Sequence, residues 1–361
     1  MKILFLNTNI GYGGASKIIV WVANQLAMAG HDVTFFTYRD NIIRQPLEPS
    51  VKLVQAQLEV TGGNANLLHS VKRIHRFIKE NHFDLGIAFL PPSILRLALA
   101  SKGTSIKLLF SQRGDPYYVT PTRNFKSKLI GRVNTWAFNQ ADGYVFQTKM
   151  AQAYYSDAIQ NKSVVIPNPI SPMLRTEIRK GNVRKSFVAV GRLDLKHKRQ
   201  DLLIGAFNHI SAKYPDYKLE IYGDGEDEHK VVEMAAVNPQ IQLMGKTDNV
   251  SSVIQNACAT VLSSDSEGIP NAVLESMSLG VPCISTDCSP GGAAMLIRNY
   301  ENGILVPKGD INALANAMEY IINHPVESER MGLQAMEVNQ IYAEKQIAEK
   351  WECFINQLNT I

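Results

Sequence analysis

The sequence has few cysteines, and they are not spaced like metal ligands. These two features argue against a metal centre and against a fold held by disulfides. Only 4 of the 361 residues are cysteine, all in the second half of the chain, at Cys258, Cys283, Cys288 and Cys353. Cys283 and Cys288 have no His or Cys partner at the spacing of a zinc site, so no metal centre is predicted. Cys283 falls inside an apolar segment and Cys258 borders one, which favours buried thiols in a reducing cytoplasm over a disulfide framework.

Long apolar runs are also missing. No run approaches the roughly 18 residues that cross a bilayer, and the apolar stretch at residues 1–7 is too short for the hydrophobic part of a signal peptide. With 45% hydrophobic and 19% charged residues, the composition is that of a globular protein. A chain of 361 residues is too long for one ordinary core, so we expect two domains in a cytoplasmic protein.

Positive charge is unevenly distributed along the chain. Residues 1–165 contain 19 Lys and Arg against 9 Asp and Glu, a net +10; subtraction from the totals of 37 and 33 leaves 18 against 24, a net −6, for residues 166–361. A basic first half predicts an anionic partner for that half, such as a membrane surface or a lipid phosphate. Nucleic acid is not expected, because the sequence contains no helix-turn-helix spacing and no platform of basic and aromatic residues.

The basic residues of the first half include those of a helix predicted over residues 123–138. Its apolar positions recur at near-helical spacing with basic side chains around them: Phe125, Leu129, Val133 and Trp136, with Arg123, Lys126, Lys128 and Arg132. An amphipathic basic helix can lie on anionic lipid, which would place the protein peripherally on the inner face of the cell membrane. The alternative is a surface helix that packs its apolar stripe onto its own domain.

Residues 259–298 carry the most informative pattern, a strand, loop and helix that occur twice in succession. The apolar run 259–262 predicts a buried strand, followed by a loop with Glu267 and Gly268 and a helix that begins near Pro270. Gly280 ends that helix, residues 281–286 form a second strand, and a second loop leads to a helix at 293–298. Such loops lie at the carboxyl ends of parallel strands, where α/β sheets bind ligands and where helix N-terminal N–H groups can hold a diphosphate.

Two glutamates flank the first of these loops. Glu267 lies in the loop itself, and Glu275 follows eight positions later, about two helical turns on. A carboxylate near such a site can accept hydrogen bonds from a pair of sugar hydroxyls, as an acidic residue does for ribose in dinucleotide-binding folds. The alternative is a pair of solvated surface residues. Two glutamates around the Gly-Ile-Pro-Asn run, between two buried strands, favour the ligand site.

Further cations and glycines follow other predicted strands. Gly191 and Arg192 end a strand at 186–190 and Lys198 precedes a helix, so two cations lie at the same edge of the sheet. Taken alone, Lys198 and its basic neighbours would indicate a solvated charge run. In the first half, a strand at 2–7 is followed by glycines at 11, 13 and 14 and by a helix at 15–29. This turn lacks a complete Gly-x-Gly-x-x-Gly and is weak evidence for a nucleotide by itself.

The Glu-x7-Glu spacing, the Gly-Arg-Leu run with its following lysine, and the Gly-Asp-Gly at 223–225 together resemble the donor site of the retaining GT-B glycosyltransferases of family 4. The resemblance covers nearly the whole chain and is strongest over residues 186–307. It implies an α/β protein of the GT-B fold, with two Rossmann-like, doubly wound domains whose parallel sheets face an interdomain cleft. The implied organisation is an acceptor-binding domain at 1–168, a linker at 169–185, a nucleotide-sugar donor domain at 186–342, and a helix at 343–361 that crosses back to the first domain.

The same resemblance implies roles for individual residues. The catalytic set is Glu267, which faces the donor sugar, with Lys198 and Arg192, which hold the diphosphate. The full donor-binding set, in which Glu275 holds the ribose, is Gly13, Gly14, Arg192, Lys198, Gly223, Gly268, Ile269, Pro270, Asn271 and Glu275. Arg113 and Asp115, which follow a strand at 106–110, are expected at the acceptor. Arg113 would contact a diphosphate or a sugar hydroxyl, or pair with Asp115, and it cannot act as a general base because it stays protonated.

The reaction implied is transfer of a sugar, with retention, from a nucleoside-diphosphate sugar to a glycan acceptor. The expected donor is a UDP-linked hexose or N-acetylhexosamine, and the expected acceptor is a glycan on a lipid diphosphate, in bacterial surface polysaccharide or glycoprotein glycan assembly. No cofactor or metal is expected, because cations and helix N–H groups would meet the leaving phosphate. Two alternatives remain: a GT-B-type nucleotide-sugar epimerase, against which the Glu-x7-Glu spacing argues, and a non-catalytic subunit that binds sugar nucleotides, against which the intact Arg192, Lys198, Glu267 and Glu275 argue.

Overall fold

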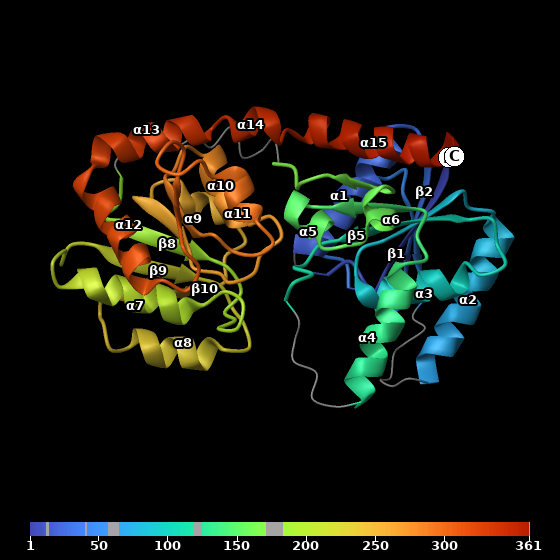
Figure 1. Ribbon diagram of the computed structural model, residues 1–361, viewed down its shortest axis with the longest axis horizontal. Helices are drawn as coiled ribbons and strands as arrows, with labels where there is room; N and C mark the ends of the chain where they lie inside the picture. Colours follow the sequence, from blue (N-terminus) through green and yellow to red (C-terminus); the bar gives the residue numbers. More distant parts are fainter. Residues whose placement is uncertain (12–13, 40–41, 57–64, 119–124, 171–182, 361) are drawn as a thin grey trace. The chain divides into compact units, whose positions relative to one another are not determined.

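The structure, a computed structural model, describes residues 1–11, 14–39, 42–56, 65–118, 125–170 and 183–360, and these fall into two α/β units. Unit 1 comprises Met1–Ile166 and Ile347–Ile361, and unit 2 comprises Pro167–Gln346. Each unit contains one parallel β-sheet with helices on both of its faces (Figure 1). The prediction of two Rossmann-like, doubly wound domains with parallel sheets is therefore confirmed.

Unit 1 is built on a seven-stranded sheet in the order β3-β2-β1-β4-β5-β6-β7. Connections run to opposite sides from β1 and β4, and this switch point is where doubly wound sheets bind ligands. Its elements are β1 (Lys2–Asn7), α1 (Gly14–Met28), β2 (Asp32–Thr37), β3 (Lys52–Gln55), α2 (Ala65–Asn81), β4 (Leu85–Ala88), α3 (Pro91–Ala100), β5 (Lys107–Gln112), α4 (Phe125–Phe138), β6 (Gly143–Phe146), α5 (Lys149–Ala153), α6 (Asp157–Gln160), β7 (Ser163–Val165) and most of α15 (Glu344–Thr360).

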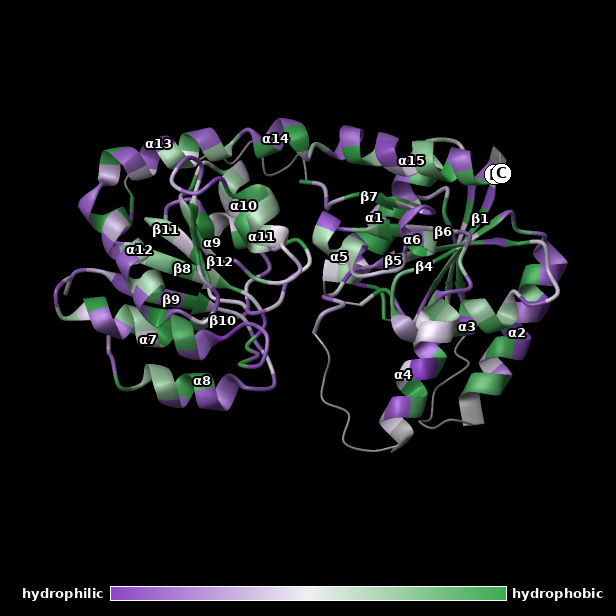
Figure 2. Ribbon diagram, in the orientation of Figure 1, coloured by the Kyte–Doolittle hydropathy of each residue, from purple (hydrophilic) through white to green (hydrophobic). Residues whose placement is uncertain are grey.

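The alternation of side chains along the strands of unit 1 explains its two helical layers. In β1, Ile3 and Phe5 belong to one buried cluster with α1 and α15, whereas Leu4 and Leu6 belong to a second with α2, α3 and α4. Both faces of the sheet are thus covered, which accounts for strands that are mostly apolar and buried (Figure 2). The C-terminal helix is part of this core, since the Trp351 ring stacks on Phe89 with 5.8 Å between centroids.

Unit 2 is built on a six-stranded sheet in the order β10-β9-β8-β11-β12-β13, with its switch point between β8 and β11. Its elements are β8 (Ser186–Val190), α7 (Gln200–Ser211), β9 (Lys218–Tyr222), α8 (Glu228–Ala235), β10 (Ile241–Gly245), α9 (Val250–Ile254), β11 (Ala259–Leu262), α10 (Asn271–Ser278), β12 (Cys283–Thr286), α11 (Gly292–Leu296), β13 (Ile304–Val306), α12 (Ile311–Asn323), α13 (Pro325–Ala335) and α14 (Val338–Ile341). The loops with the predicted donor residues follow β8 and β11, so both leave the sheet at its switch point.

Three details of the elements differ from the sequence prediction. Strand β7 was not predicted; it pairs with β6 in parallel and forms the sheet edge. With only three residues, none of them fully buried, β7 is too short to show a periodic pattern. Helix α10 begins at Asn271, and Pro270 precedes it as an extended N-cap residue at φ −73° and ψ 96°. The strand predicted from residue 281 begins at Cys283, after Pro282, which has no N–H to donate.

The boundary between the units falls a few residues from the predicted one. Residues 167–170 belong to unit 2, where the Asn168 side chain donates to Asn271 Oδ1 at 2.7 Å and the Ile170 N–H donates to the Tyr342 carbonyl at 2.8 Å. Residues 171–182, most of the predicted linker, lie outside the described residues. In the described part of the chain, none of the helices combines the length and the apolar character that spanning a bilayer requires.

Candidate active site

The loops that follow β8 and β11 are joined at the switch point of unit 2. Ser263 Oγ donates to the Lys198 carbonyl at 2.9 Å, and the Asp265 N–H donates to the His197 carbonyl at 2.8 Å. These bonds connect positions more than 60 residues apart in the chain, because β8 and β11 are neighbours in the sheet. The two loops therefore form one continuous surface at the carboxyl ends of the strands.

Two of the three predicted catalytic residues are in direct contact on this surface. Lys198 Nζ forms an ion pair with Glu267 Oε1, and Ser264 Oγ donates to the same carboxylate oxygen at 3.0 Å. The side chains of Lys198 and Glu267 are only 22% and 14% exposed. Separating the two groups would leave each charge partly buried without a counter-charge, which is costly. The ion pair therefore holds both side chains in place at the switch point.

The Arg192 side chain is oriented by Asp194, which was not among the predicted site residues. The buried Asp194 carboxylate lies 3.2 Å from Arg192 Nη2 and accepts from the Lys196 N–H at 3.1 Å and from the His197 N–H at 3.2 Å. The His197 imidazole Nδ1 also lies 2.9 Å from this carboxylate. Asp194 thus shapes the loop after β8, while the Arg192 side chain stays 62% exposed and available to a ligand.

A second set of ion pairs, made by Arg199, joins the start of α7 to the loop after β11. Arg199 adopts a left-handed conformation at φ 51° and ψ 48° and donates to Asp265 at 2.9 Å and to Asp201 at 2.8 Å. The hydrogen bonds to Asp201 and then to Asp265 raise the pKa of the Arg199 guanidinium above its ordinary value. The sequence placed Arg199 in a basic run, whereas in the structure it fixes the two loops against each other.

Glycines allow the neighbouring loops to approach closely. Gly223 has φ +147°, and a Cβ there would lie 1.9 Å from the Gly191 carbonyl oxygen. In the loops after β11 and β12, a Cβ on Gly292 would lie 1.6 Å from the Gly268 carbonyl oxygen. A side chain at Gly223 or Gly292 would clash with backbone, so both positions have a packing reason to be glycine. The predicted donor role of Gly223 is additional to this structural one.

The predicted residues 268–271 form the entry into α10. Ile269 is buried in the core beneath the loop, so a ligand would meet its backbone and not its side chain. The Glu267 N–H donates to the Ser289 carbonyl at 2.8 Å, which joins this loop to the one after β12. The first-turn N–H groups of α10 have no acceptor within the helix, as at any helix start. Glu275, partly buried, lies one turn further along α10, and its side chain projects back towards the helix start.

The predicted residues of unit 1 lie at the carboxyl edge of its own sheet. Gly14 is the exposed first residue of α1, and Gly13 lies outside the described residues. Arg113 follows β5, with its guanidinium carbon 4.4 Å from the centre of the Phe89 ring and 5.6 Å from that of Trp351. Burial lowers the pKa of Arg113 to about 9, so it remains a cation at neutral pH. Asp115 Oδ1 accepts from the Tyr117 N–H at 2.9 Å, within its own turn.

Two doubly wound domains, with charged loops at the switch point of the second, form a GT-B architecture, and the comparison with protein families assigns the chain to the glycosyltransferases. Residues 12–173 match the family model described as Glycosyltransferase Family 4, and residues 184–324 match the model described as Glycosyl transferases group 1. The chain belongs to the family 4 glycosyltransferases. Across the described residues, no group of three or more His, Cys, Asp or Glu side chains is arranged to hold a metal ion.

Named relatives agree with this assignment. An uncharacterized glycosyltransferase of Haemophilus influenzae is 25% identical over 356 residues, which cover 97% of this chain and 99% of the relative. The Campylobacter jejuni enzyme named "GalNAc-alpha-(1->4)-GalNAc-alpha-(1->3)-diNAcBac-PP-undecaprenol alpha-1,4-N-acetyl-D-galactosaminyltransferase" is 25% identical over 339 residues, 90% of this chain and 89% of that enzyme. The protein is therefore a transferase, and the name of one relative contains a lipid-linked glycan.

Solved structures share the fold. Sucrose-phosphate synthase from Thermosynechococcus elongatus superposes with a TM-score of 0.83 at 18% identity, over 99% of this chain and 98% of that one. Anabaena HepE in complex with UDP and glucose gives a TM-score of 0.75 at 18% identity, over 99% of both chains. At these identities the likeness concerns the fold alone, and the roles of individual residues stay predictions.

Proposed function

We propose that this glycosyltransferase moves a sugar from a UDP-sugar to a glycan carried on a lipid diphosphate, with retention of configuration at the anomeric carbon. The observation that carries the proposal is the ion pair between Lys198 and Glu267 at the switch point of unit 2, beside the start of α10. It puts a cation suited to phosphate next to a carboxylate suited to sugar hydroxyls. The UDP and glucose named with Anabaena HepE, and the lipid-linked acceptor in the name of the Campylobacter relative, support the substrate classes.

In the proposed donor complex, the diphosphate lies between Lys198, Arg192 and the first-turn N–H groups of α10. Charge-assisted hydrogen bonds of this kind contribute roughly 1.5–3 kcal/mol each. Negative charge on the leaving diphosphate grows as the bond to the sugar breaks, so these cations stabilise the transition state more than the bound donor. Glu267 then faces the sugar, and Glu275 accepts from the ribose hydroxyls.

The proposed transfer step proceeds on one face of the sugar. The acceptor hydroxyl oxygen forms the new bond to the anomeric carbon while the bond from that carbon to the phosphate oxygen breaks. The electron pair of the broken bond leaves with UDP, and a phosphate oxygen takes the acceptor proton. Glu267 serves this step as a sugar-binding residue and not as a covalent nucleophile, because its carboxylate is engaged by Lys198 and Ser264.

A panel of nucleotide sugars tests the donor assignment. We expect at least one UDP-sugar to be hydrolysed slowly without acceptor and to raise the melting temperature, and both effects to persist in EDTA, since cationic side chains meet the phosphate charge. The measurement is UDP release and thermal denaturation with and without chelator. Loss of hydrolysis in EDTA, restored by a divalent ion, would contradict the metal-free site, and absence of hydrolysis with every donor would favour a non-catalytic binding subunit.

Helix α4 supports a peripheral membrane site as part of the proposal. The helix packs onto its domain through the buried Ala137 and Phe138. Two residues of the predicted apolar stripe, Leu129 and Trp136, are instead 51% and 40% exposed, and the neighbouring Ile130 is 52% exposed. The domain leaves much of Leu129 and Trp136 uncovered, which supports the membrane interpretation over a stripe packed onto its own domain, and Figure 2 shows hydrophobic and hydrophilic residues interleaved along this helix. The side chains of Phe125 and Lys126 lie outside the described residues.

We expect the protein to float with anionic vesicles at low salt and not with neutral ones. Each basic residue near an anionic surface contributes about 1 kcal/mol, and this attraction is screened over about 8 Å at physiological salt. Reversal of two exposed charges on α4, in Lys128→Glu with Arg132→Glu, should release the protein while donor hydrolysis is unchanged. The matched control reverses two exposed charges of unit 2, in Lys308→Glu with Arg330→Glu, and should still float. Absence of vesicle binding at low salt would leave α4 without this role.

A further inference from the structure

An open cavity of about 410 Å³ lies at the carboxyl edge of the sheet of unit 1. Four segments form it: the start of α3, the end of β5 with the turn that follows it, the second half of α4, and the stretch from the end of α5 into α6. Its volume is within the range of roughly 300–1,000 Å³ that is typical of small-molecule sites. None of the predicted donor-binding residues is among the described residues that line this cavity.

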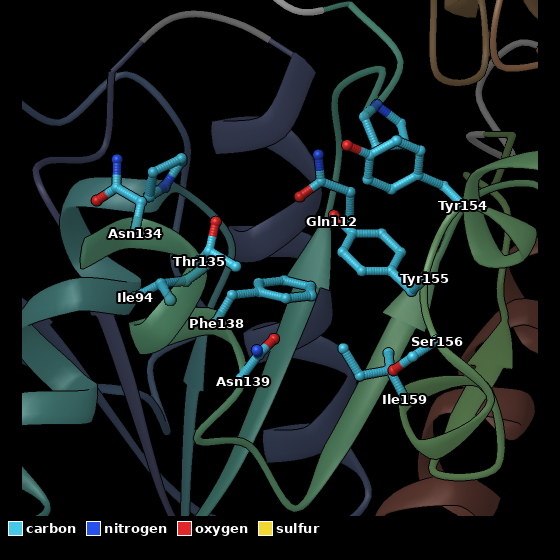
Figure 3. A pocket seen from close by; sticks show the side chains of 12 residues that line it. Ile94, Gln112, Asn134, Thr135, Phe138, Asn139, Tyr154, Tyr155, Ser156 and Ile159 are labelled. Atoms are coloured by element: carbon cyan, nitrogen blue, oxygen red, sulfur yellow. The ribbon is translucent and has the colours of Figure 1, made fainter. Parts of the chain in front are cut away.

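Aromatic side chains line one part of the cavity. The rings of Phe138 and Tyr155 stack with centroids 5.1 Å apart, and Tyr154 contacts Tyr155 edge-on at 5.1 Å. Figure 3 shows Phe138 entering from α4, and Tyr154 and Tyr155 entering from the opposite side. Burial raises the pKa of the Tyr155 hydroxyl, which therefore stays neutral. The contacts among these rings fix their orientation before any ligand arrives.

Neutral amide groups supply the polar part of the lining. Gln112 lines the cavity and donates through its Nε2 to the Gly114 carbonyl at 3.3 Å, which leaves its Oε1 able to accept a hydrogen bond from a ligand. The amides of Asn134 and Asn139 also line the cavity, and neither makes a side-chain hydrogen bond to another of the described residues. Each offers both a donor and an acceptor. In Figure 3 the Asn134 and Gln112 amides are separated by the open space of the cavity.

The charge of the lining limits what can bind. No Lys, Arg, Asp or Glu is present among the described residues that line the cavity. A diphosphate would find no counter-charge there, and a polyisoprenyl chain would cover the amides without offering them hydrogen bonds, which is costly. A pyranose ring presents an apolar C–H face to an aromatic ring and hydroxyl groups to amides at its rim, which matches both parts of the lining.

We infer that this cavity binds a neutral pyranose unit of the acceptor glycan. The inference rests on the proposed function, because it names a part of the acceptor in that same reaction. Under this inference, the cavity recognises an uncharged sugar of the acceptor. Cationic groups elsewhere in unit 1 would recognise the diphosphate of the acceptor. The size of the cavity admits one or two pyranose rings.

Saturation-transfer NMR on the full-length protein tests the inference directly. The probes are the methyl α-glycosides of glucose, mannose and N-acetylgalactosamine, each neutral. We expect at least one to receive saturation at its ring protons, with binding that is insensitive to salt. Tyr154→Ala and Asn134→Ala should each weaken it about fivefold or more. Both replace residues at the cavity rim and not in the core, and Tyr300→Ala, which removes a similarly exposed tyrosine in unit 2, is the matched control.

Kinetics then separate this inference from the proposed function. Tyr154→Ala and Asn134→Ala should raise the acceptor KM about fivefold or more, while UDP-sugar hydrolysis without acceptor stays as in wild type. Wild-type sugar binding and acceptor KM in both variants would overturn the inference, as would binding that appears only with a sugar phosphate and declines with salt. Absence of hydrolysis by the wild-type protein with every nucleotide sugar would instead overturn the proposed function, whatever the glycosides show.

Discussion

Lys198→Ala is expected to lower kcat/KM for sugar transfer by about 10²–10³-fold, because a positioned cation is removed from the charge that develops on the leaving diphosphate. The loss should appear mainly in kcat, since the negative charge on the phosphate oxygen is greatest in the transition state. Initial rates of UDP release over a range of donor concentrations measure both parameters. Lys198→Arg, which keeps the charge with a different geometry, should recover part of the lost rate.

The controls for this prediction come from the same loop. Lys196→Ala removes an exposed lysine two residues earlier and should leave the rate close to that of wild type. Lys198→Ala leaves the Glu267 carboxylate, 14% exposed, without its cationic partner, which should cost about 1–3 kcal/mol of unfolding free energy. The Lys198→Met and Glu267→Gln double variant removes both charges and should recover stability but not activity. A folded Lys198→Ala protein with wild-type turnover would remove Lys198 from the phosphate site.

Glu275→Ala and Glu267→Ala should affect different steps. Glu275 is assigned to the ribose hydroxyls, so its loss should weaken UDP binding by about tenfold or more. Glu267 is assigned to the donor sugar, so Glu267→Ala should leave UDP affinity near that of wild type while kcat declines by about 10²-fold. Calorimetric titration with UDP, together with initial rates, separates the two effects. Glu329→Ala, at an exposed position of unit 2, controls for the loss of one negative charge.

The opposite pattern would reverse these roles. If Glu267→Ala abolished UDP binding and Glu275→Ala did not, the loop glutamate would hold the nucleotide and the helix glutamate the sugar. Equal and small effects in both variants would remove both glutamates from the donor site and leave Glu267 a structural role in its ion pair with Lys198. Each outcome therefore changes a named assignment.

The sequence predicts the meeting of Lys198 and Glu267 because the rule involved is topological. Residues that follow neighbouring strands of a parallel sheet reach the same edge, so a separation of 69 positions is no obstacle. The fold class and the catalytic candidates of unit 2 follow from short apolar runs and the loops between them. The terminal helix was also predictable, since Ile347, Trp351, Ile355 and Leu358 share one face, and all four are buried in unit 1.

Other parts of the site depend on contacts that no local pattern encodes. The buried Asp194 and the Arg199–Asp265 pair depend on loop conformation, including the left-handed backbone of Arg199, which residue type alone does not predict. The cavity of unit 1 is assembled from four segments, and its aromatic residues indicate an ordinary core when they are considered singly. Glycines such as Gly292 are visible in the sequence, but the carbonyl that excludes a side chain there belongs to another loop.

The configuration of the product at the anomeric carbon tests the central claim most directly. Proton NMR of the first product formed from an α-linked UDP-sugar of the gluco or galacto series shows the configuration through the coupling of the anomeric proton. We predict an α-linked product, because the acceptor attacks the face from which UDP departs, and the same product in EDTA. A β-linked first product would contradict the retaining reaction proposed for the Lys198–Glu267 site.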